Sequence, residues 1–264
     1  MLTVVKNQLR VMLLSVKYNV VREMTNRVTF LTNVIFMILN NASFIIQWLI
    51  FFQIKETIGG YTMNDVMLLW GIAASTYGFS FTFFKGAYSL PKLIMNGKID
   101  AFLVQPKDVL LGISTSETKV SAIGDLLYGY IILCIFHFSL YKLLMFTLFT
   151  ITGGIIITAF AIIIGSLGFY IVKADAFADS LNGIMTNIAT YPDQIFQFGI
   201  KVMMYTVLPV GFSAFLPLRT MLNFNLIALV QIFGFTILIT LLAFFVFYRG
   251  LRKYSSSNLM SARI

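Results

Sequence analysis

The sequence predicts an all-α membrane protein with six transmembrane helices, an amphipathic N-terminal helix at the membrane interface and both termini in the cytoplasm. Hydrophobic residues make up 59% of the chain and charged residues only 11%, which leaves too little polar surface to cover a soluble core. Most Lys and Arg residues flank apolar runs on alternate sides, as the positive-inside rule expects. Residues 1–264 hold six spans of about 20 residues each as a single domain.

Residues 1–27 are predicted to lie on the membrane surface. Val5, Leu9, Met12 and Val16 share one face of a helix over residues 4–24, because apolar residues three or four positions apart line one side of an α-helix. Basic residues group along the edge of that face. Such a helix binds at the membrane interface with its apolar side buried.

Two spans follow, over residues 28–52 and 65–84, with a polar connection between them. In the second span small residues recur four positions apart, in the pairs Gly71 with Ser75 and Ala74 with Gly78. Small residues at this spacing let a neighbouring helix approach closely. We therefore expect these pairs to serve helix packing.

Residues 85–119 form the longest predicted segment outside the membrane. Pro91, Gly97, Pro106 and five lysines interrupt short amphipathic pieces there, and proline and glycine end helices or turn the chain. We expect this central segment to lie in the cytoplasm and to bind a partner protein. The alternative is an ordinary polar loop.

The second half of the chain supplies the other spans. Residues 120–140 and 143–172 are predicted to form a helical hairpin. Residues 175–192 are too polar to cross a membrane alone, so the fifth span is placed over residues 198–216 and the sixth over residues 226–248. A basic tail, residues 249–264, follows.

The distribution of basic residues predicts the orientation. Lys55, Lys142 and Arg219 lie on the predicted outer side, and the other sixteen Lys and Arg residues lie on the inner side. This asymmetry places both termini in the cytoplasm. The net charge of +9 does not indicate nucleic-acid binding, because the basic residues lie at the ends of apolar segments rather than on a polar surface.

Catalytic and metal-binding motifs are missing from the sequence. It contains no Gly-x-x-x-x-Gly-Lys-Ser/Thr phosphate loop, no His-Glu-x-x-His and no Gly-x-Ser-x-Gly. Cys134 and His137 are its only cysteine and its only histidine, which argues against a disulfide framework or a thiolate metal cluster. We expect no catalytic residue, no metal site and no cofactor bound by this chain itself.

Asp125 is the carboxylate that needs an explanation. It lies about two turns inside the third span, and an acidic group in lipid must face protein or water. We expect a hydroxyl or a lysine on a neighbouring helix to satisfy it. The alternative is a role in a translocation path or gate, together with the helix breaks at Tyr191, Pro192, Pro209 and Pro217.

The order of these features resembles the permease subunits of ATP-binding-cassette (ABC) exporters of the second type. The resemblance covers nearly the whole chain. It rests on the basic N-terminal helix, residues 97–106 (GKIDAFLVQP), the start of the third span at residues 121–125 (SAIGD), Tyr191-Pro192, and residues 248–256 (YRGLRKYSS).

The resemblance implies a permease subunit in the plasma membrane of a bacterium. It would form the translocation path for an amphipathic substrate such as a drug, a peptide or a lipid-like molecule. A separate cytoplasmic ABC ATPase would bind ATP and Mg²⁺ and supply the energy, which agrees with the missing phosphate loop. A second permease, identical or related, would complete the path.

In that family a coupling helix after the second span docks on the ATPase, and it maps here onto residues 89–107. The residues that we expect to dock are Leu90, Pro91, Lys92, Leu93, Gly97 and Asp100. The family also has short membrane-entering helices on the outer side, which match residues 209–219 and suggest an outer gate.

Two other functions stay open at this stage. An ion-coupled secondary transporter or channel is the main alternative, in which Asp125 and the break near Tyr191 would serve ion movement. A membrane-embedded enzyme is the third, and the lack of any catalytic pair argues against it.

Overall fold

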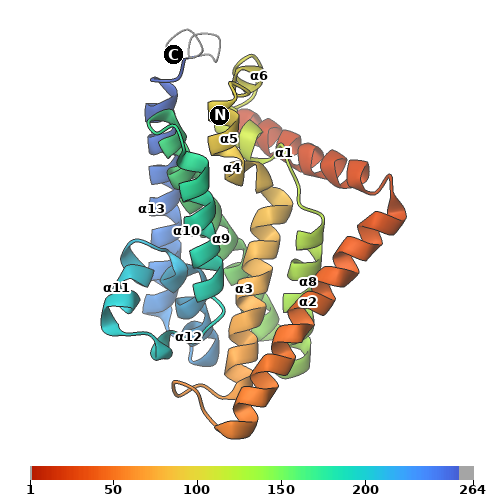
Figure 1. Cartoon of the computed structure of the whole chain (residues 1–264), viewed down its shortest axis with the longest axis vertical. Coiled ribbons are helices and arrows are strands. Elements are labelled where there is room, and N and C mark those ends of the chain that lie inside the picture. Colours follow the sequence, from red (N-terminus) through yellow and green to blue (C-terminus); the bar gives the residue numbers. More distant parts are fainter. Residues whose placement is uncertain (1, 256–264) are drawn as a thin grey trace.

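The computed structural model describes residues 2–255, with side chains from residue 6 onward. Every element defined over that range is a helix, apart from one antiparallel bridge between Ile58 and Tyr61. Figure 1 shows the long helices running along the longest axis of the molecule. Met1 and residues 256–264 of the predicted tail lie outside the described residues.

The N-terminal helix α1 (Leu2–Glu23) lies across one end of the helix bundle (Figure 1). The Asn19 side-chain amide donates a hydrogen bond to the Thr115 carbonyl at 3.2 Å. The Gln8 side chain accepts from the backbone N–H of Asp108 at 3.4 Å. Helix α1 therefore rests on the central segment. We call this end of the molecule the proximal end and the opposite end the distal end.

Helices α2 (Arg27–Ile54) and α3 (Met63–Phe83) run to the distal end and back (Figure 1). The Asn26 side chain caps the start of α2, and Thr62 forms a capping box with Asp65 at the start of α3. Such caps satisfy backbone N–H groups that have no partner inside the helix. They explain why both helices begin close to the positions predicted from the sequence.

Four short helices form the central segment at the proximal end: α4 (Lys85–Tyr88), α5 (Leu90–Met95), α6 (Asp100–Leu103) and α7 (Val109–Ser114). Asp108 caps α7 and also accepts a hydrogen bond from the Tyr248 hydroxyl at 2.5 Å. Tyr248 lies near the end of the last helix, α13 (Leu226–Leu251). One carboxylate thus joins α7 to α13, and the end of α13 belongs to the proximal end.

Helix α8 (Ser121–Phe136) returns to the distal end, and α9 (Leu140–Gly165) comes back, continued by a 3₁₀ helix (Ser166–Phe169). Glycines let α8 approach its neighbours closely. A Cβ at Gly78 of α3 would lie 2.7 Å from the Leu126 Cα, and one at Gly124 would lie 2.7 Å from the Val34 carbonyl oxygen of α2. Both separations are too short for a real side chain, so the prediction that small residues of the second span serve packing is confirmed.

Helix α10 (Ala174–Ile188) connects the two ends of the molecule. Near its start, Asp179 pairs with Lys92 of α5. Beyond its end, the Tyr191 ring packs on Trp48 of α2, with 5.8 Å between centroids, and Asp193 accepts from the Tyr61 hydroxyl. The polar segment that we expected not to cross the membrane therefore runs from the proximal towards the distal end.

The stretch expected to form a kinked fifth span, residues 198–216, contains helix α11 (Phe198–Thr206) and a π-helical turn (Gly211–Phe215) that continues into α12 (Leu216–Leu222). The helices on either side of the break at residues 207–210 are bent by 85°. Asp193, before α11, forms an ion pair with Arg219 of α12, so both ends of the stretch lie at the distal end. The stretch therefore turns back instead of running between the two ends of the molecule. Pro209 lies in the break, and it has no N–H with which to continue a helix.

By length and composition, four helices in the described range can cross a membrane: α2, α3, α9 with its 3₁₀ extension, and α13. The bent pair would be a fifth if it were one span. Helix α8 is apolar but has only 16 residues, and α10 has 15. Helices α3 and α9 are mostly buried, whereas α2 and α13 are mostly exposed. The core therefore lies around α3 and α9, and apolar side chains of α2 and α13 face outward.

Candidate functional site

Two of the residues expected to dock on a partner are buried. Leu90 has no exposed surface, and Pro91 is buried beside it in the first turn of α5. A Cβ at Gly165 would lie 3.2 Å from Leu90, and one at Gly168 would lie 3.3 Å from Pro91. Both side chains thus pack against the end of α9 and the 3₁₀ helix after it, where they hold α5 in place.

Gly97 and Asp100 shape the turn between α5 and α6. Gly97 has φ of +67°, a left-handed conformation that favours glycine after a helix. The N–H of Lys98 then donates to the carbonyl of the half-buried Leu93 at 2.9 Å. Burial and the neighbouring Asp100 carboxylate raise the pKa of Tyr254 to about 12. The start of α6 therefore lies beside the chain that follows α13.

The exposed part of the central segment is its tip, around α6. Val104 is 84% exposed and Leu103 is 43% exposed, and the side chains of Lys92 and Lys98 are exposed in the same segment. An apolar tip beside basic side chains is a surface that a protein partner can cover. Lys92 was predicted to dock and Val104 was not, although an apolar pair inside a polar loop was a usable signal in the sequence.

An ion pair links the central segment to α10. The Lys92 ammonium lies 3.2 Å from the Asp179 carboxylate, with 57% and 60% of the two side chains exposed. A pair this exposed adds little stability because water screens it. Its effect is to fix where α5 meets α10.

Further basic groups lie at the two ends of the central segment. The ammonium groups of Lys85 and Lys119 lie 5.7 and 5.5 Å from the centroid of the Phe81 ring. Burial lowers the pKa of Lys85, and the nearby Glu117 carboxylate opposes that change. The Ser89 hydroxyl donates to Glu117 at 2.7 Å, which ties the start of α5 to the chain before α8.

A cavity of about 450 Å³ lies between α2, α3, the start of α8 and α10. Asp125 lines it, is 9% exposed and accepts a hydrogen bond from the Asn41 amide at 2.5 Å. We expected a hydroxyl or a lysine on a neighbouring helix to satisfy it; the hydrogen-bond donor is instead a side-chain amide of α2, and Lys119 acts on Asp125 only at longer range. An amide satisfies one carboxylate oxygen but brings no positive charge.

The cavity gathers only some of the residues expected in a path or gate. Tyr191 lines it together with Thr186 and Asn187 of α10, and the next residue, Pro192, is buried. Pro209 and Pro217 are buried in the bent α11–α12 region and do not line this cavity.

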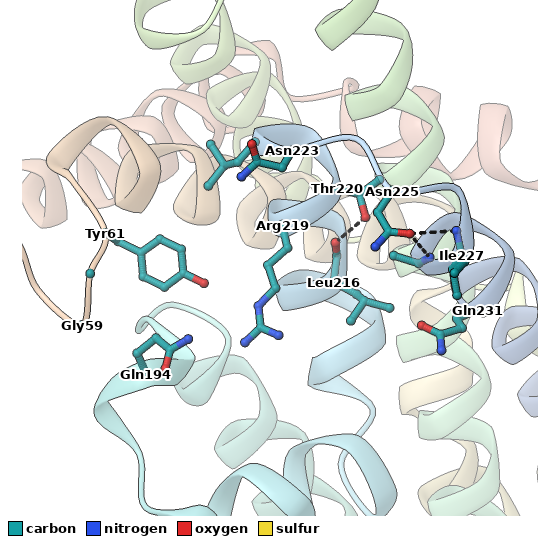
Figure 2. Close-up of a pocket in the computed structure, with 13 residues that line it drawn as sticks. Gly59, Tyr61, Gln194, Leu216, Arg219, Thr220, Asn223, Asn225, Ile227 and Gln231 are labelled. Atoms are coloured by element: carbon teal, nitrogen blue, oxygen red, sulfur yellow. Dashed lines mark hydrogen bonds between the residues drawn. The ribbon is translucent and has the colours of Figure 1, made fainter.

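A second pocket, of about 640 Å³, opens at the distal end. Figure 2 shows Tyr61, from the connection between α2 and α3, and Arg219, from α12, pointing towards each other. Arg219 pairs with Asp193, which is 1% exposed, and Tyr61 donates to the same carboxylate at 3.3 Å. Burial raises the pKa of Tyr61. Two distal connections and helix α12 therefore meet at one buried carboxylate.

A comparison with known proteins identifies the family to which the chain belongs. A model of ABC-2 family transporter proteins matches residues 37–258, which is most of the chain. The chain belongs to the ABC-2 transporter family. No curated protein and no solved structure matches it.

This ABC-2 permease is a multi-pass membrane protein and the membrane component of an ABC transporter, not its ATPase. The central segment and the cavity both lie within the matched residues. In the described range, no three His, Cys, Asp or Glu residues are grouped so that they could hold a metal ion.

Proposed function

We propose that this ABC-2 permease forms the translocation path of a bacterial exporter for an amphipathic substrate. A separate ATPase, which binds ATP and Mg²⁺, docks at the proximal end in the cytoplasm. A second permease, identical or related, completes the path. Helices α8 and α10 join the four long apolar helices as crossings, so the chain spans the plasma membrane six times.

The observation that carries this proposal is the position of α10. Asp179 near its start pairs with Lys92 of the central segment, and Thr186 and Asn187, about two turns later, line the cavity. A helix is stiff over this length, so a displacement of α5 also displaces one cavity wall. ATP-driven closure of the ATPase pair would shift the balance between two arrangements of the permeases as a rigid-body movement.

The tip of the central segment is the surface that would dock. Val104 and Leu103 supply exposed apolar area, and Lys92 and Lys98 supply positive charge in the same segment. A matching groove would have an apolar floor and carboxylates on its rim, since complementary charge gives specificity and a fast association rate. Leu90 and Pro91 do not dock in this proposal. They are buried against the end of α9 and hold the tip in place.

The charge distribution favours a cytoplasmic proximal end. With α10 as the fifth crossing, Lys173 stays on the inner side and Lys201 of α11 moves to the outer side. Four basic residues then lie outside and fifteen inside. This is still the asymmetry that the positive-inside rule describes.

Co-purification tests the proposal. The tagged chain is extracted from its native membranes in mild detergent, and we expect a phosphate-loop ATPase to come with it. Val104→Asp should abolish that recovery, because a charge replaces the most exposed apolar contact. Val172→Asp is the matched control, since Val172 is 80% exposed but lies outside the central segment.

Two results would count against the proposal. Equal recovery with Val104→Asp would show that the ATPase docks elsewhere. Absence of any ATPase, together with transport by the purified chain in liposomes driven only by an ion gradient, would overturn the permease function.

The second result would favour the ion-coupled alternative. The observation behind that alternative is Asp125, a buried carboxylate whose hydrogen bond comes from an uncharged amide. In an ion-coupled transporter, Asp125→Asn should abolish gradient-driven transport, because the group that takes up the proton or cation is lost.

A further inference from the structure

The cavity between α2, α3, α8 and α10 holds a carboxylate that forms no ion pair among the described residues and on which Lys119 acts only at longer range. Asp125 is 9% exposed, and the Asn41 amide occupies one of its oxygens. Among the described residues, no Lys or Arg lies within the 4.0 Å of an ion pair with it. A buried charge is costly unless it is paired and hydrogen-bonded. The second oxygen of Asp125 is therefore an unfilled acceptor in the cavity.

Aromatic rings surround the same space. Phe44 stacks on Trp70 with 4.5 Å between centroids, and Tyr191 packs on Trp48 at the distal side. Phe44, Trp70, Tyr77 and Tyr191 all line the cavity. Ring faces attract cations and also cover hydrocarbon. A carboxylate within such a lining suits a molecule with a positive head and an apolar body.

Trp70 presents its ring, and not its N–H, to the cavity. It lines the cavity and is 6% exposed. Its indole N–H, which can only donate, has no hydrogen-bond partner within the described part of the chain, but that atom is itself buried. A ligand in the cavity therefore meets the aromatic surface of Trp70.

Lys119 also lines the cavity, and its positive charge acts on Asp125 at longer range than an ion pair. Its ammonium lies over the Phe81 ring at 5.5 Å, and Lys119 precedes α8, whereas Asp125 lies inside that helix. A bound cation would therefore gain its favourable interaction by contacting the Asp125 carboxylate directly, on the side away from Lys119.

We propose that this cavity binds the ammonium group of an amphipathic amine, with the unfilled oxygen of Asp125 accepting its hydrogen bond and the aromatic rings covering its apolar body. The volume of about 450 Å³ is in the range of pockets for drug-sized molecules. The inference rests on the proposed function only in taking this amine to be the transported substrate. Binding itself needs no ATPase, so the two can fail separately.

Dansylcadaverine is a suitable probe, because it joins a primary ammonium to a fluorescent apolar group through a sulfonamide. Dansylpentylamine, which lacks the amine, is the matched uncharged analogue. The chain has two tryptophans, and Trp48 and Trp70 lie in one cluster beside the cavity. Energy transfer from tryptophan to dansyl therefore reports occupancy in the full chain, purified with its partners and placed in lipid nanodiscs.

We expect saturable energy transfer with dansylcadaverine that an unlabelled alkylamine displaces. The uncharged analogue should bind about tenfold more weakly or worse, because it lacks the charge-assisted hydrogen bond. Equal binding of the two probes to the unaltered chain would overturn the proposal without any variant. So would transfer that never saturates, because that is the signature of probe dissolved in lipid.

Asp125→Asn keeps the shape of the side chain and removes its charge, and it should weaken dansylcadaverine binding by about tenfold or more. Asp175→Asn is the matched control, since Asp175 lies at the start of α10 and does not line the cavity. Unchanged affinity in Asp125→Asn, or an equal loss in Asp175→Asn, would contradict the assignment. Amine binding without a co-purifying ATPase would leave the inference standing and remove the exporter function.

Discussion

The Lys92 ammonium lies 3.2 Å from the Asp179 carboxylate, 87 positions later in the chain. Because both side chains are more than half exposed, we expect Lys92→Glu to change the free energy of unfolding by less than about 1 kcal/mol. It should nevertheless lower substrate-stimulated ATPase activity of the assembled transporter, since α5 would lose its tie to α10. The double variant Lys92→Glu with Asp179→Lys should restore part of that activity, because the contact with α10 returns while the positive charge at the docking tip does not. If both variants fold but the double variant recovers no ATPase activity, the contact between Lys92 and Asp179 plays no part in coupling.

Gly78 allows α3 and α8 to touch. A Cβ there would lie 2.7 Å from the Leu126 Cα, so Gly78→Ala must push two backbones apart. We expect a loss of about 1–3 kcal/mol, as in other overpacked sites, measured as a lower melting temperature in detergent. Gly234→Ala in α13 is the control, because a Cβ there meets nothing within 4 Å. It should leave stability unchanged or raise it slightly through better helix propensity. Equal melting temperatures for the two variants would refute the close contact.

Removing Arg219 should destabilise the protein more than removing its ion-pair partner Asp193. The carboxylate is 2% exposed and the guanidinium side chain 45% exposed, so only the arginine can be solvated when its partner is lost. We expect Arg219→Met to destabilise the protein by about 1–3 kcal/mol, because it leaves a buried charge unpaired. Asp193→Asn should cost less, and the double variant less than the sum of the two. Thermal unfolding of all three variants tests this ranking of stability losses. A larger loss in Asp193→Asn than in Arg219→Met would contradict it.

Labelling of single cysteines distinguishes α10 from residues 198–216 as the fifth crossing. In a Cys134→Ser background, Gln197→Cys and Asn223→Cys should both react with a membrane-impermeant maleimide on intact cells, because α11 and α12 begin and end at the distal side. Asn96→Cys in the central segment is the inner control and should react only after the cells are opened. Protection of Gln197→Cys with labelling of Asn223→Cys would show that residues 198–216 form the fifth span after all.

The long helices were predicted well from the sequence. The lengths of the apolar runs and the capping residues at the helix starts indicate the same boundaries. Helices α2, α3 and α13 begin beside Asn26, Thr62 and Asn225, each of which caps its helix with a side-chain oxygen. Such signals are local, so they are visible without knowledge of the fold.

Helix α10 is a crossing only under the proposed function, and hydropathy did not suggest one because it averages over all faces of a helix. Thr186 and Asn187 lower that average, yet they line a cavity, so they would not oppose insertion as lipid-facing polar groups would.

Pro209 indicated a break in the chain but not the 85° change of direction. The ion pair between Asp193 and Arg219, which joins the two ends of the bent stretch, could not be read from sequence spacing.

The candidate site was predictable only in part. The central segment was found from its composition, but the burial of Leu90 and Pro91 depends on contacts with the chain after α9, and sequence spacing contains no information on that packing. Asp125 stood out as a carboxylate in an apolar run, whereas its partner Asn41 lies 84 positions away on α2.

The glycine contacts of α8 give the cavity an asymmetric construction. Gly124 fixes α2 and Gly78 fixes α3 against the same helix at backbone distance, and contacts of that kind leave no side chain whose rotation could absorb a shift. Helix α10 is held differently: a Cβ at its Gly183 would meet nothing within 4 Å, and the helix packs through side chains such as Ala178 and Met185, which are buried in the core. Three walls therefore form one rigid frame, and any change in the width of the chamber requires the side chains between α10 and that frame to repack.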